Sequence, residues 1–356
     1  MVRVGLIGFG MAGQAFHAPV IRGVPGMELA CILERRGTRA QEKYPEVAVA
    51  RTLDELLADK AIQLCVIATP NDSHFELAKA CLSAGRDVVV DKPFAPTLGE
   101  SEELVRLAAE RGRLITVYQD RRWDGDFGTV KEIVASGKLG KVVEYECRYD
   151  RFRLEPRANA WRERPDQPGA GVLFDLGPHV IDQALVLFGE PQTITASAFC
   201  ERETSRVDDS FDVCMEYPNL GAGLRAMGRA RIIAFAPGPH FLIHGTKGSF
   251  VKYGMDPQEA RLRGEDCPDG LDWGADWGIE EEQLWGTLSL VGEASVKVKT
   301  ERGDYRGFYA NVRDAIEKKA ALDVTPEQAL RTMHAVMLAH KSSRERRTVE
   351  WSEAVQ

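Results

Sequence analysis

The chain has 356 residues, a formal net charge of -8 at pH 7 and a pI near 5.6. This length predicts two domains, each large enough for a hydrophobic core of its own. The acidic charge and the absence of a lysine- or arginine-rich block in the sequence argue against a nucleic-acid partner. Met1 leads straight into an apolar strand, and no apolar run reaches membrane length, so we expect a cytoplasmic protein without a membrane partner.

Cysteine use indicates the same compartment. The seven cysteines are odd in number and widely scattered, and none forms a C-x-x-C motif or a cysteine–histidine cluster. We therefore expect buried free thiols in a reducing compartment and no bound metal. The cysteines are Cys31, Cys65, Cys81, Cys147, Cys200, Cys214 and Cys267.

A glycine-rich turn follows the first predicted strand, Val2–Ile7, at once. In its G-x-G-x-x-G pattern, Gly8 allows a tight turn, Gly10 lets the backbone approach a pyrophosphate and Gly13 lets a helix sit close to the strand. Residues 15–22 read as that helix, whose first N–H groups would face the phosphates. The strand before and the helix after favour a dinucleotide site over a glycine turn without a ligand.

Strand and helix patterns alternate over residues 1–120. A helix is expected from His74 to Ala84, with possible caps at residues 71–73, and another from about Ser101 to Arg111. Alternating apolar strands and helices predict an α/β domain, a Rossmann-type doubly wound parallel sheet covered on both faces. The expected strands are Val2–Ile7, Glu28–Leu33, Ala48–Ala50, Ile62–Ala68, Asp87–Val90 and Leu114–Tyr118.

Polar and turn residues follow five of these strands. Ligands of doubly wound sheets bind beyond the carboxyl ends of the strands, so the five ends together predict one site, although each alone is weak evidence. The residues at these ends are Gly8, Glu34, Thr69, Pro70, Asn71, Asp91, Lys92, Pro93 and Gln119.

The pattern changes over residues 121–356. Long strands with little helix between them predict an α+β domain with an open, largely antiparallel sheet, whose last helices can pack back on the first domain. An open sheet usually has its outer face covered by a second subunit, so we expect a homodimer or homotetramer formed through it. The expected strands are 142–151, 193–201, 210–216, 222–231, 240–243 and 249–252, and the expected helices are 124–136, 180–188, 308–320 and 326–344.

The chemistry of alcohol oxidation needs a base for the hydroxyl proton and a positive neighbour for the developing alkoxide. Lys92, at a strand end before Pro93, could supply the charge, although most lysines are simply solvated. A lone His179 would more often be a satisfied interior side chain, but Asp175 lies four residues earlier, where the two share a helix face. Pro178 fits best in the first turn of a helix, so Asp175 is expected either in the helix or on its lead-in.

Four of these motifs resemble the glucose-fructose oxidoreductase, inositol dehydrogenase and MocA (Gfo/Idh/MocA) family: residues 8–13, residues 68–74, Asp91-Lys92-Pro93 and Asp175…His179. The similarity covers essentially the whole chain, and residues 119–126, 150–153 and 252–259 resemble the scyllo-inositol dehydrogenase branch. Asp91 stands where many members carry glutamate, which is a conservative departure.

The resemblance implies an NAD(P)-dependent dehydrogenase that acts on a CH–OH group of a cyclitol or sugar, with Lys92, Asp175 and His179 as the catalytic group and His179 as proton acceptor. The expected cofactor contacts are Gly8, Gly10, Met11, Ala12, Gly13, Glu34, Arg35, Thr69, Pro70, Asn71, His74, Asp91, Lys92 and Gln119. The expected substrate contacts, of types that suit a hydroxyl-rich ligand, are Lys92, Arg122, Trp123, Asp124, Arg151, Trp161, Arg162, Asp175 and His179.

The choice between NAD and NADP depends on the end of the second strand. Glu34 lies 21 residues past Gly13, where an acid binds the ribose hydroxyls and favours NAD. Arg35 and Arg36 follow, and a guanidinium there could hold a 2′-phosphate or stack on adenine. The NADP-using scyllo-inositol enzymes that the chain resembles tend to have a small polar residue in place of Glu34. The sequence favours NAD and leaves NADP open.

Other functions within the same fold stay open. Some members of the family are thought to sense dinucleotides or partner proteins without turnover, and these typically lose the catalytic lysine or histidine, whereas this chain keeps both. Among enzymes, the alternatives are a sugar dehydrogenase and a transhydrogenase that passes hydride between two sugars on a retained cofactor.

Overall fold

The computed structural model describes residues 1–156, 161–264 and 267–355. The chain forms two compact units: the first contains Met1–Trp123, Pro257–Trp277 and Asp304–Leu330, and the second contains Asp124–Asp256, Gly278–Gly303 and Arg331–Gln356. The first unit thus ends three residues past the predicted boundary at residue 120 and also takes in two later segments of the chain. No helix in the described part of the chain is long and apolar enough to cross a membrane.

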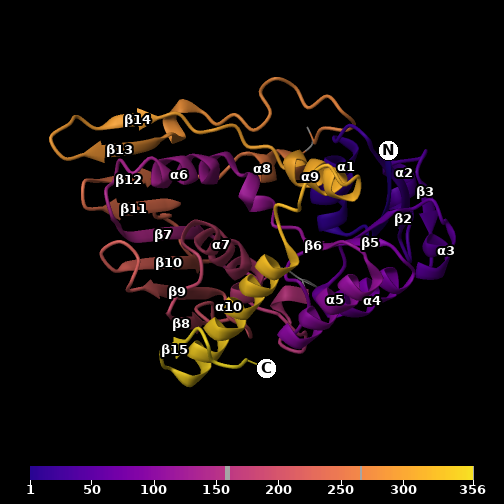
Figure 1. Cartoon of the computed structure of the whole chain (residues 1–356), viewed down its shortest axis with the longest axis horizontal. Coiled ribbons are helices and arrows are strands. Elements are labelled where there is room, and N and C mark those ends of the chain that lie inside the picture. Colours follow the sequence, from indigo (N-terminus) through magenta and orange to yellow (C-terminus); the bar gives the residue numbers. More distant parts are fainter. Residues whose placement is uncertain (157–160, 265–266, 356) are drawn as a thin grey trace. The chain divides into compact units, whose positions relative to one another are not determined.

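The first unit is built on a sheet of six parallel strands in the order β3-β2-β1-β4-β5-β6, which confirms the predicted doubly wound arrangement. Figure 1 labels β2, β3, β5 and β6 of this sheet. Every residue of β4 and β5 is buried, as expected for central strands covered on both faces. The strands are β1 (Val2–Ile7), β2 (Met27–Leu33), β3 (Ala48–Ala50), β4 (Leu64–Ile67), β5 (Asp87–Val90) and β6 (Ile115–Val117).

The helices of this unit differ from expectation at their starts. The helix after the glycine turn opens as a π-helix, and residues 71–73 form a 3-10 turn without a side-chain cap on the next helix; Ser73 Oγ instead donates to Pro70 O at 2.7 Å. The helices are η1 (Gly13–His17), α1 (Ala18–Arg22), α2 (Arg39–Lys43), α3 (Leu53–Ala58), η2 (Asn71–Ser73), α4 (His74–Ser83), α5 (Leu98–Arg111), η3 (Asp120–Trp123), α8 (Gln258–Arg263) and α9 (Arg306–Ile316).

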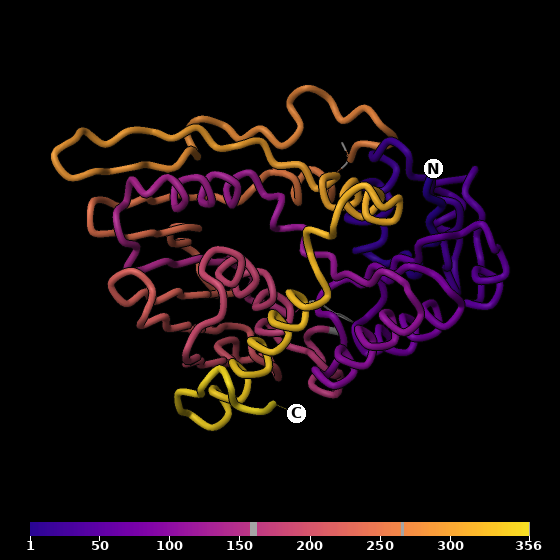
Figure 2. The backbone as a smooth tube through the Cα atoms, in the orientation of Figure 1, coloured from indigo at the N-terminus to yellow at the C-terminus, as the bar shows by residue number. Residues whose placement is uncertain are grey.

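The later segments of the chain complete the core of the first unit. In Figure 2 the tube of α9 lies beside that of α1, although the two are far apart in sequence. Trp277, Phe308 and Tyr309 are buried in the same hydrophobic cluster as Val4 and Val20. Residues 257–277 and 304–330 are therefore part of the dinucleotide-type unit and not an appendage to it.

The second unit contains a nine-stranded sheet in the order β14-β13-β12-β11-β7-β10-β9-β8-β15. Only the central β7–β10 pair is parallel, which confirms the largely antiparallel sheet. Its strands are β7 (Val142–Asp150), β8 (Thr193–Phe199), β9 (Ser210–Tyr217), β10 (Leu224–Arg231), β11 (Phe241–Gly245), β12 (Gly248–Lys252), β13 (Gly286–Leu290), β14 (Val296–Val298) and β15 (Val349–Glu350). Strands β13, β14 and β15 were not predicted; β14 and β15 are short strands at the two edges of the sheet, and β13 lies between β12 and β14.

One face of this sheet packs against helices. Alternate residues such as Tyr145 and Tyr149 on β7 are buried in the core with side chains of α6 (Gly125–Ala135), α7 (Val172–Phe188) and α10 (Pro326–Glu345). Helix α7 packs closely on β10 at Gly228, where a Cβ would stand only 2.6 Å from Val180 Cγ2. The remaining short helices are η4 (Trp161–Glu163) and η5 (Glu282–Leu284).

Helix α7 corrects one expectation. The sequence placed its start near Val180 because Pro178 suits a first turn. The helix instead begins at Val172, with Pro178 inside it, so Asp175 belongs to its first turn and not to a lead-in. His179 follows one turn later on the same helix.

All seven cysteines are free thiols. Cys31, Cys65, Cys81 and Cys147 are buried as expected, whereas Cys200 is exposed and Cys214 and Cys267 are half-buried. The expectation of buried thiols throughout was therefore wrong at Cys200, which lies just past the end of β8 where the sheet no longer covers the chain.

Candidate functional site

The glycine turn after β1 contains two glycines at which the fold leaves no room for a side chain, and a third, Gly10, at which it does. Gly8 has a φ of 100°, and a Cβ on it would lie 2.7 Å from Ala68 O. A Cβ on Gly13 would lie 2.3 Å from Gly8 O. A Cβ on Gly10 would meet no atom within 4 Å. Because no described residue excludes a side chain there, the open space before Gly10 fits the close approach of a ligand such as a pyrophosphate.

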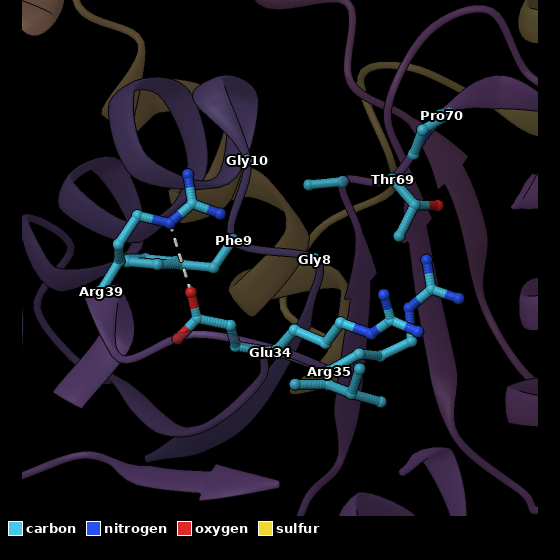
Figure 3. A pocket seen from close by; sticks show the side chains of 11 residues that line it. Gly8, Phe9, Gly10, Glu34, Arg35, Arg39, Thr69 and Pro70 are labelled. Carbon is cyan, nitrogen blue, oxygen red and sulfur yellow. Dashed lines mark hydrogen bonds and ion pairs between the residues drawn. The ribbon is translucent and has the colours of Figure 1, made fainter. Parts of the chain in front are cut away.

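A pocket of about 520 Å³ opens in front of this turn (Figure 3). Six of the residues expected to bind the cofactor line it, together with five that were not in that set. The first group is Gly8, Gly10, Glu34, Arg35, Thr69 and Pro70, and the second is Phe9, Leu33, Arg36, Arg39 and Ala68. The ends of β1, β2 and β4 thus meet at one pocket, as the doubly wound topology predicts.

Glu34 is engaged by the protein itself. Its side chain is only 4 % exposed, and Oε2 accepts a hydrogen bond from Ala40 N at 3.1 Å while Oε1 lies 3.4 Å from Arg39 Nε. Figure 3 shows Arg39 above this carboxylate and Arg35 on the Thr69 side of the pocket. Glu34 therefore accepts a hydrogen bond at the start of α2 and lies beside Arg39, contacts that the sequence alone does not reveal.

Two amide side chains at the strand ends have buried polar atoms without a hydrogen-bond partner among the described residues. Asn71 is 1 % exposed and neither its Nδ2 nor its Oδ1 is paired; Gln119 is 3 % exposed and its Oε1 is unpaired. Buried amide atoms almost always find partners, so such atoms mark places where a ligand or water completes the bonding. Both residues were among the expected cofactor contacts.

His74 has a different environment from the one expected of a cofactor contact. Nδ1 lies 2.9 Å from Pro93 O and Nε2 lies 3.0 Å from Thr69 O, so both ring nitrogens face backbone carbonyls. Burial lowers the pKa of His74, while the charge of Asp91 and the two carbonyls oppose this fall. The histidine ties the loop after β4 to the loop after β5.

Lys92 follows β5 and is held from behind by Asp91. Lys92 N donates to Asp91 Oδ1 at 2.9 Å, and the Lys92–Pro93 peptide bond is cis. Asp91 Oδ1 also lies 3.9 Å from Nε2 of His17, a fully buried histidine whose Nδ1 is 2.6 Å from Tyr309 Oη. Burial alone would raise the pKa of Asp91, but His17 and the Lys92 cation outweigh it and lower that pKa below its usual value. The sequence analysis did not single out His17.

A second buried acid, Asp120, lies within electrostatic reach of Lys92. Burial raises the pKa of Asp120 to about 6; the charge of Asp91 adds to this rise, whereas Arg121 and Lys92 oppose it. The strand ends of the first unit therefore carry two carboxyl groups that respond to the lysine charge, one ionised and one that titrates near neutral pH.

Three of the expected substrate contacts meet in a pocket of about 70 Å³ in the second unit, which we call the arginine pocket. Arg162 Nε lies 2.8 Å from Asp175 Oδ1, and Arg151 lines the same space. The lining is completed by Arg153, Glu163, Gly171, Val172, Leu176, Arg202, Val207, Asp208 and Ile232. His179 is 6 % exposed and stacks on Tyr149 at 6.1 Å between ring centroids.

Arg122 and Trp123, two further expected substrate contacts, have structural partners in the first unit. Arg122 Nη1 donates to Asp323 O at 2.9 Å and to Gln328 Oε1 at 2.7 Å, and the Trp123 ring packs edge-on against Phe308. Asp124 is buried at the start of α6. Trp161 begins η4, and its side chain lies outside the part of the chain that the structure describes. Among the described residues, no group of three or more histidine, cysteine or acidic side chains could hold a metal ion.

Comparison with known proteins covers both units. The model of an oxidoreductase family with an NAD-binding Rossmann fold matches residues 2–119, and that of the GFO/IDH/MocA C-terminal domain matches residues 127–251. The chain is 42 % identical to the uncharacterised oxidoreductase YdgJ of Escherichia coli, over 98 % of each chain. It is 36 % identical to the scyllo-inositol 2-dehydrogenase (NADP(+)) IolW of Bacillus subtilis, over 98 % of this chain and 95 % of IolW.

Solved structures show the same similarity. The oxidoreductase yvaA from Bacillus subtilis superimposes with a TM-score of 0.90 at 34 % identity, covering 98 % of both chains. The oxidoreductase YPO2259 from Yersinia pestis gives a TM-score of 0.91 at 38 % identity, covering 100 % of this chain and 98 % of the other.

Proposed function

Because this chain belongs to the Gfo/Idh/MocA family of oxidoreductases, we propose that it is an NAD(P)-dependent dehydrogenase that oxidises a secondary alcohol of a cyclitol or sugar, with scyllo-inositol as the first candidate. The observation that carries the cofactor half of this proposal is Gly10, which faces open pocket space that the protein does not fill. The substrate half is supported by the similarity to IolW and by the polar, arginine-rich pocket beside Asp175.

The proposed chemistry divides between two groups. The nicotinamide, when bound, supplies the acceptor for the hydride that leaves the carbinol carbon. His179 takes the hydroxyl proton, and Lys92 stabilises the negative charge that develops on the oxygen. Asp91 fixes the backbone of Lys92 through its hydrogen bond to the lysine N–H. Arg162 holds Asp175 in the first turn of α7, one turn before His179.

We also propose that the cofactor pocket favours NADP. The sequence argument for NAD required Glu34 to serve the ribose hydroxyls, but its carboxylate is bonded to Ala40 N and lies beside Arg39. Three arginines and one glutamate line this end of the pocket, which suits a 2′-phosphate.

Kinetics with both cofactors test this choice. Arg35→Ala should lower kcat/KM for NADP by about tenfold, since a charge-assisted hydrogen bond contributes ~1.5–3 kcal/mol, and should leave kcat/KM for NAD nearly unchanged. Arg106→Ala, on the exposed face of α5, is the matched control. A wild-type preference for NAD would reject the NADP proposal and leave the dehydrogenase intact.

A panel of cyclitols and aldoses with NAD and with NADP, read by the absorbance of the reduced cofactor, tests the enzymatic activity. Turnover of scyllo-inositol above the aldoses supports the first candidate, and the reverse ranking supports a sugar dehydrogenase. Cofactor that stays with the protein through gel filtration would instead indicate a sugar–sugar transhydrogenase. Dinucleotide binding without turnover of any alcohol would indicate a sensor.

We propose that the outer face of the nine-stranded sheet joins subunits in a homodimer or homotetramer. The face opposite the helices carries charged residues in cross-strand pairs, among them Arg225 with Glu144 at 3.3 Å and Arg231 with Asp212 at 2.6 Å. Such a flat polar face can meet its own copy around a twofold axis. Light scattering of the purified protein gives the number of subunits, and a monomer would refute this proposal.

A further inference from the structure

The start of α7 is capped by a residue from a distant loop. The N-cap residue, Gly171, has no side chain, so the first N–H groups of the helix need other acceptors. Val172 N donates to Asp208 O at 2.9 Å, and Leu173 N donates to Asp208 Oδ2 at 2.7 Å. Asp208 lies in the loop between β8 and β9, 35 residues after Leu173 in the sequence. It therefore takes the role that a local serine, threonine or aspartate plays in most helices.

Gly171 is shaped for this contact. Its φ is 99°, and a Cβ on it would stand 2.0 Å from Asp208 Oδ1 and 2.6 Å from Asp208 Cγ. Any other residue at this position would displace the carboxylate from the helix. The glycine and the distant aspartate thus act as one unit, because each permits the other.

The loop that presents Asp208 is itself firmly held. The neighbouring Asp209 accepts hydrogen bonds from Glu201 N at 2.7 Å and from Arg202 Nε at 2.9 Å. Arg202 also pairs with Glu163 of η4 at 3.2 Å. Gly171 N donates to Arg162 O at 2.8 Å, and the side chain of that same arginine pairs with Asp175. The cap, η4 and the first turn of α7 are therefore bonded into one assembly.

We propose that Asp208 is a positioning residue for the dehydrogenase: by capping α7 it fixes the first turn of the helix and so the aim of Asp175 and His179. This inference rests on the proposed function, since it assigns those two residues their work. Asp208 acts through the backbone of α7 and takes no part in the proton or hydride transfer.

The ionisation of Asp208 should make the stability of the cap depend on pH. Burial raises the pKa of Asp208 to about 6; the N–H groups of Leu173 and Val172 oppose this rise, and the charge of Asp209 adds to it. A carboxyl whose pKa is raised in its site is held there more tightly when protonated. The protection of the first turn of α7 should therefore be greatest below about pH 4, the ordinary pKa of an aspartate, and should be lost as the pH rises through about 6. The other charged groups that line this pocket are Arg151, Arg153, Arg162, Glu163, Asp175 and Arg202.

Hydrogen exchange of the segment 171–176 tests the cap without any need for activity. In the wild-type protein, protection corrected for the intrinsic rate should fall by about tenfold between pH 5 and pH 8, since one pKa unit is a factor of ten. Asp208→Asn accepts the same hydrogen bond without ionising, so its protection should not change with pH. Asp208→Ala should lose about fivefold of the protection at pH 5. Asp166→Asn, an exposed acid in the preceding loop, is the control and should match wild type.

Steady-state kinetics test the positioning. Asp208→Ala should lower kcat by about tenfold and leave the KM for the cofactor unchanged, because misaligned groups lose rate more than cofactor binding. Asp208→Asn should restore kcat, and Gly171→Ala should reproduce the alanine variant by pushing the carboxylate away. A wild-type kcat in Asp208→Ala would overturn the positioning role. Wild-type protein that shows the expected exchange but turns over no alcohol would support the cap and refute the proposed function.

Discussion

His17 and Tyr309 are 292 residues apart in sequence, yet His17 Nδ1 lies 2.6 Å from the tyrosine hydroxyl in the core of the first unit. The other ring nitrogen of His17 faces Asp91, whose carboxylate holds the backbone N–H of Lys92. The proposed catalytic lysine is therefore supported by a line of buried polar side chains that runs from α9 through η1 to the end of β5. These side chains can position Lys92 without contacting a ligand themselves.

Removing members of this line should separate stability from cofactor binding. His17→Ala should lower the free energy of unfolding by ~2–4 kcal/mol, because it leaves a cavity and removes the partner of two buried groups. Tyr309→Phe keeps the ring and deletes only the hydroxyl, so it should cost ~1 kcal/mol. Urea unfolding followed by circular dichroism measures both. Equal losses in the two variants would mean that the hydroxyl and not the histidine carries the support.

Lys92→Ala should abolish turnover and leave cofactor affinity nearly intact. Loss of a group that stabilises charge only in the transition state typically costs ~3 kcal/mol or more, a rate loss of ~100-fold. We expect no measurable turnover in this variant, whereas titration with the dinucleotide should quench tryptophan fluorescence as it does in the wild-type protein. Near wild-type kcat in this variant would remove Lys92 from the mechanism.

His179→Asn tests the proton acceptor. If His179 is the base, the rate of alcohol oxidation by the wild-type protein should rise with pH through one ionisation, and the variant should lose that limb. Asp175→Asn should lower the rate less, because Asp175 orients and tunes but does not receive the proton. The measurement is kcat/KM against pH for the three proteins. A limb that persists in His179→Asn would assign the proton to another residue.

The glycines of the first turn allow a contrast within one motif. Gly10→Ala places its methyl group in open space, so we expect wild-type stability and weakened dinucleotide binding. Gly13→Ala drives a Cβ to within 2.3 Å of Gly8 O and should destabilise the first unit. Thermal unfolding with and without dinucleotide distinguishes the two. Undiminished binding by Gly10→Ala would move the pyrophosphate away from this turn.

The accuracy of the sequence-based predictions depends on how local the cause of each feature is. The strands of the first unit and the Gly112 stop of α5 follow from apolar runs and a left-handed glycine, which neighbouring residues reveal. The start of α7 does not, because its cap comes from Asp208, and Gly171 reads locally as a loop residue. Likewise, Glu34 occupies the position expected of a ribose contact, but only the fold shows that Ala40 N binds its carboxylate.

The pockets show the same division. Six of the residues predicted at the glycine turn and the strand ends line the pocket before that turn, since topology alone brings strand ends to one edge. Arg202 of the arginine pocket lies in the loop after β8 and Glu163 lies in η4, and no spacing in the sequence links them. His17 was missed for a similar reason, because its partners lie at the end of another strand and on a helix near the C-terminus.

The return of the chain to the first unit has a consequence for synthesis. Trp277, Phe308 and Tyr309 are buried in the same hydrophobic cluster as residues of β1. A fragment ending at Trp123 would therefore expose apolar side chains of that cluster to water. During synthesis, most strands of the second unit are therefore translated before the segments that complete the core of the first unit. We therefore expect an isolated fragment of residues 1–123 to aggregate.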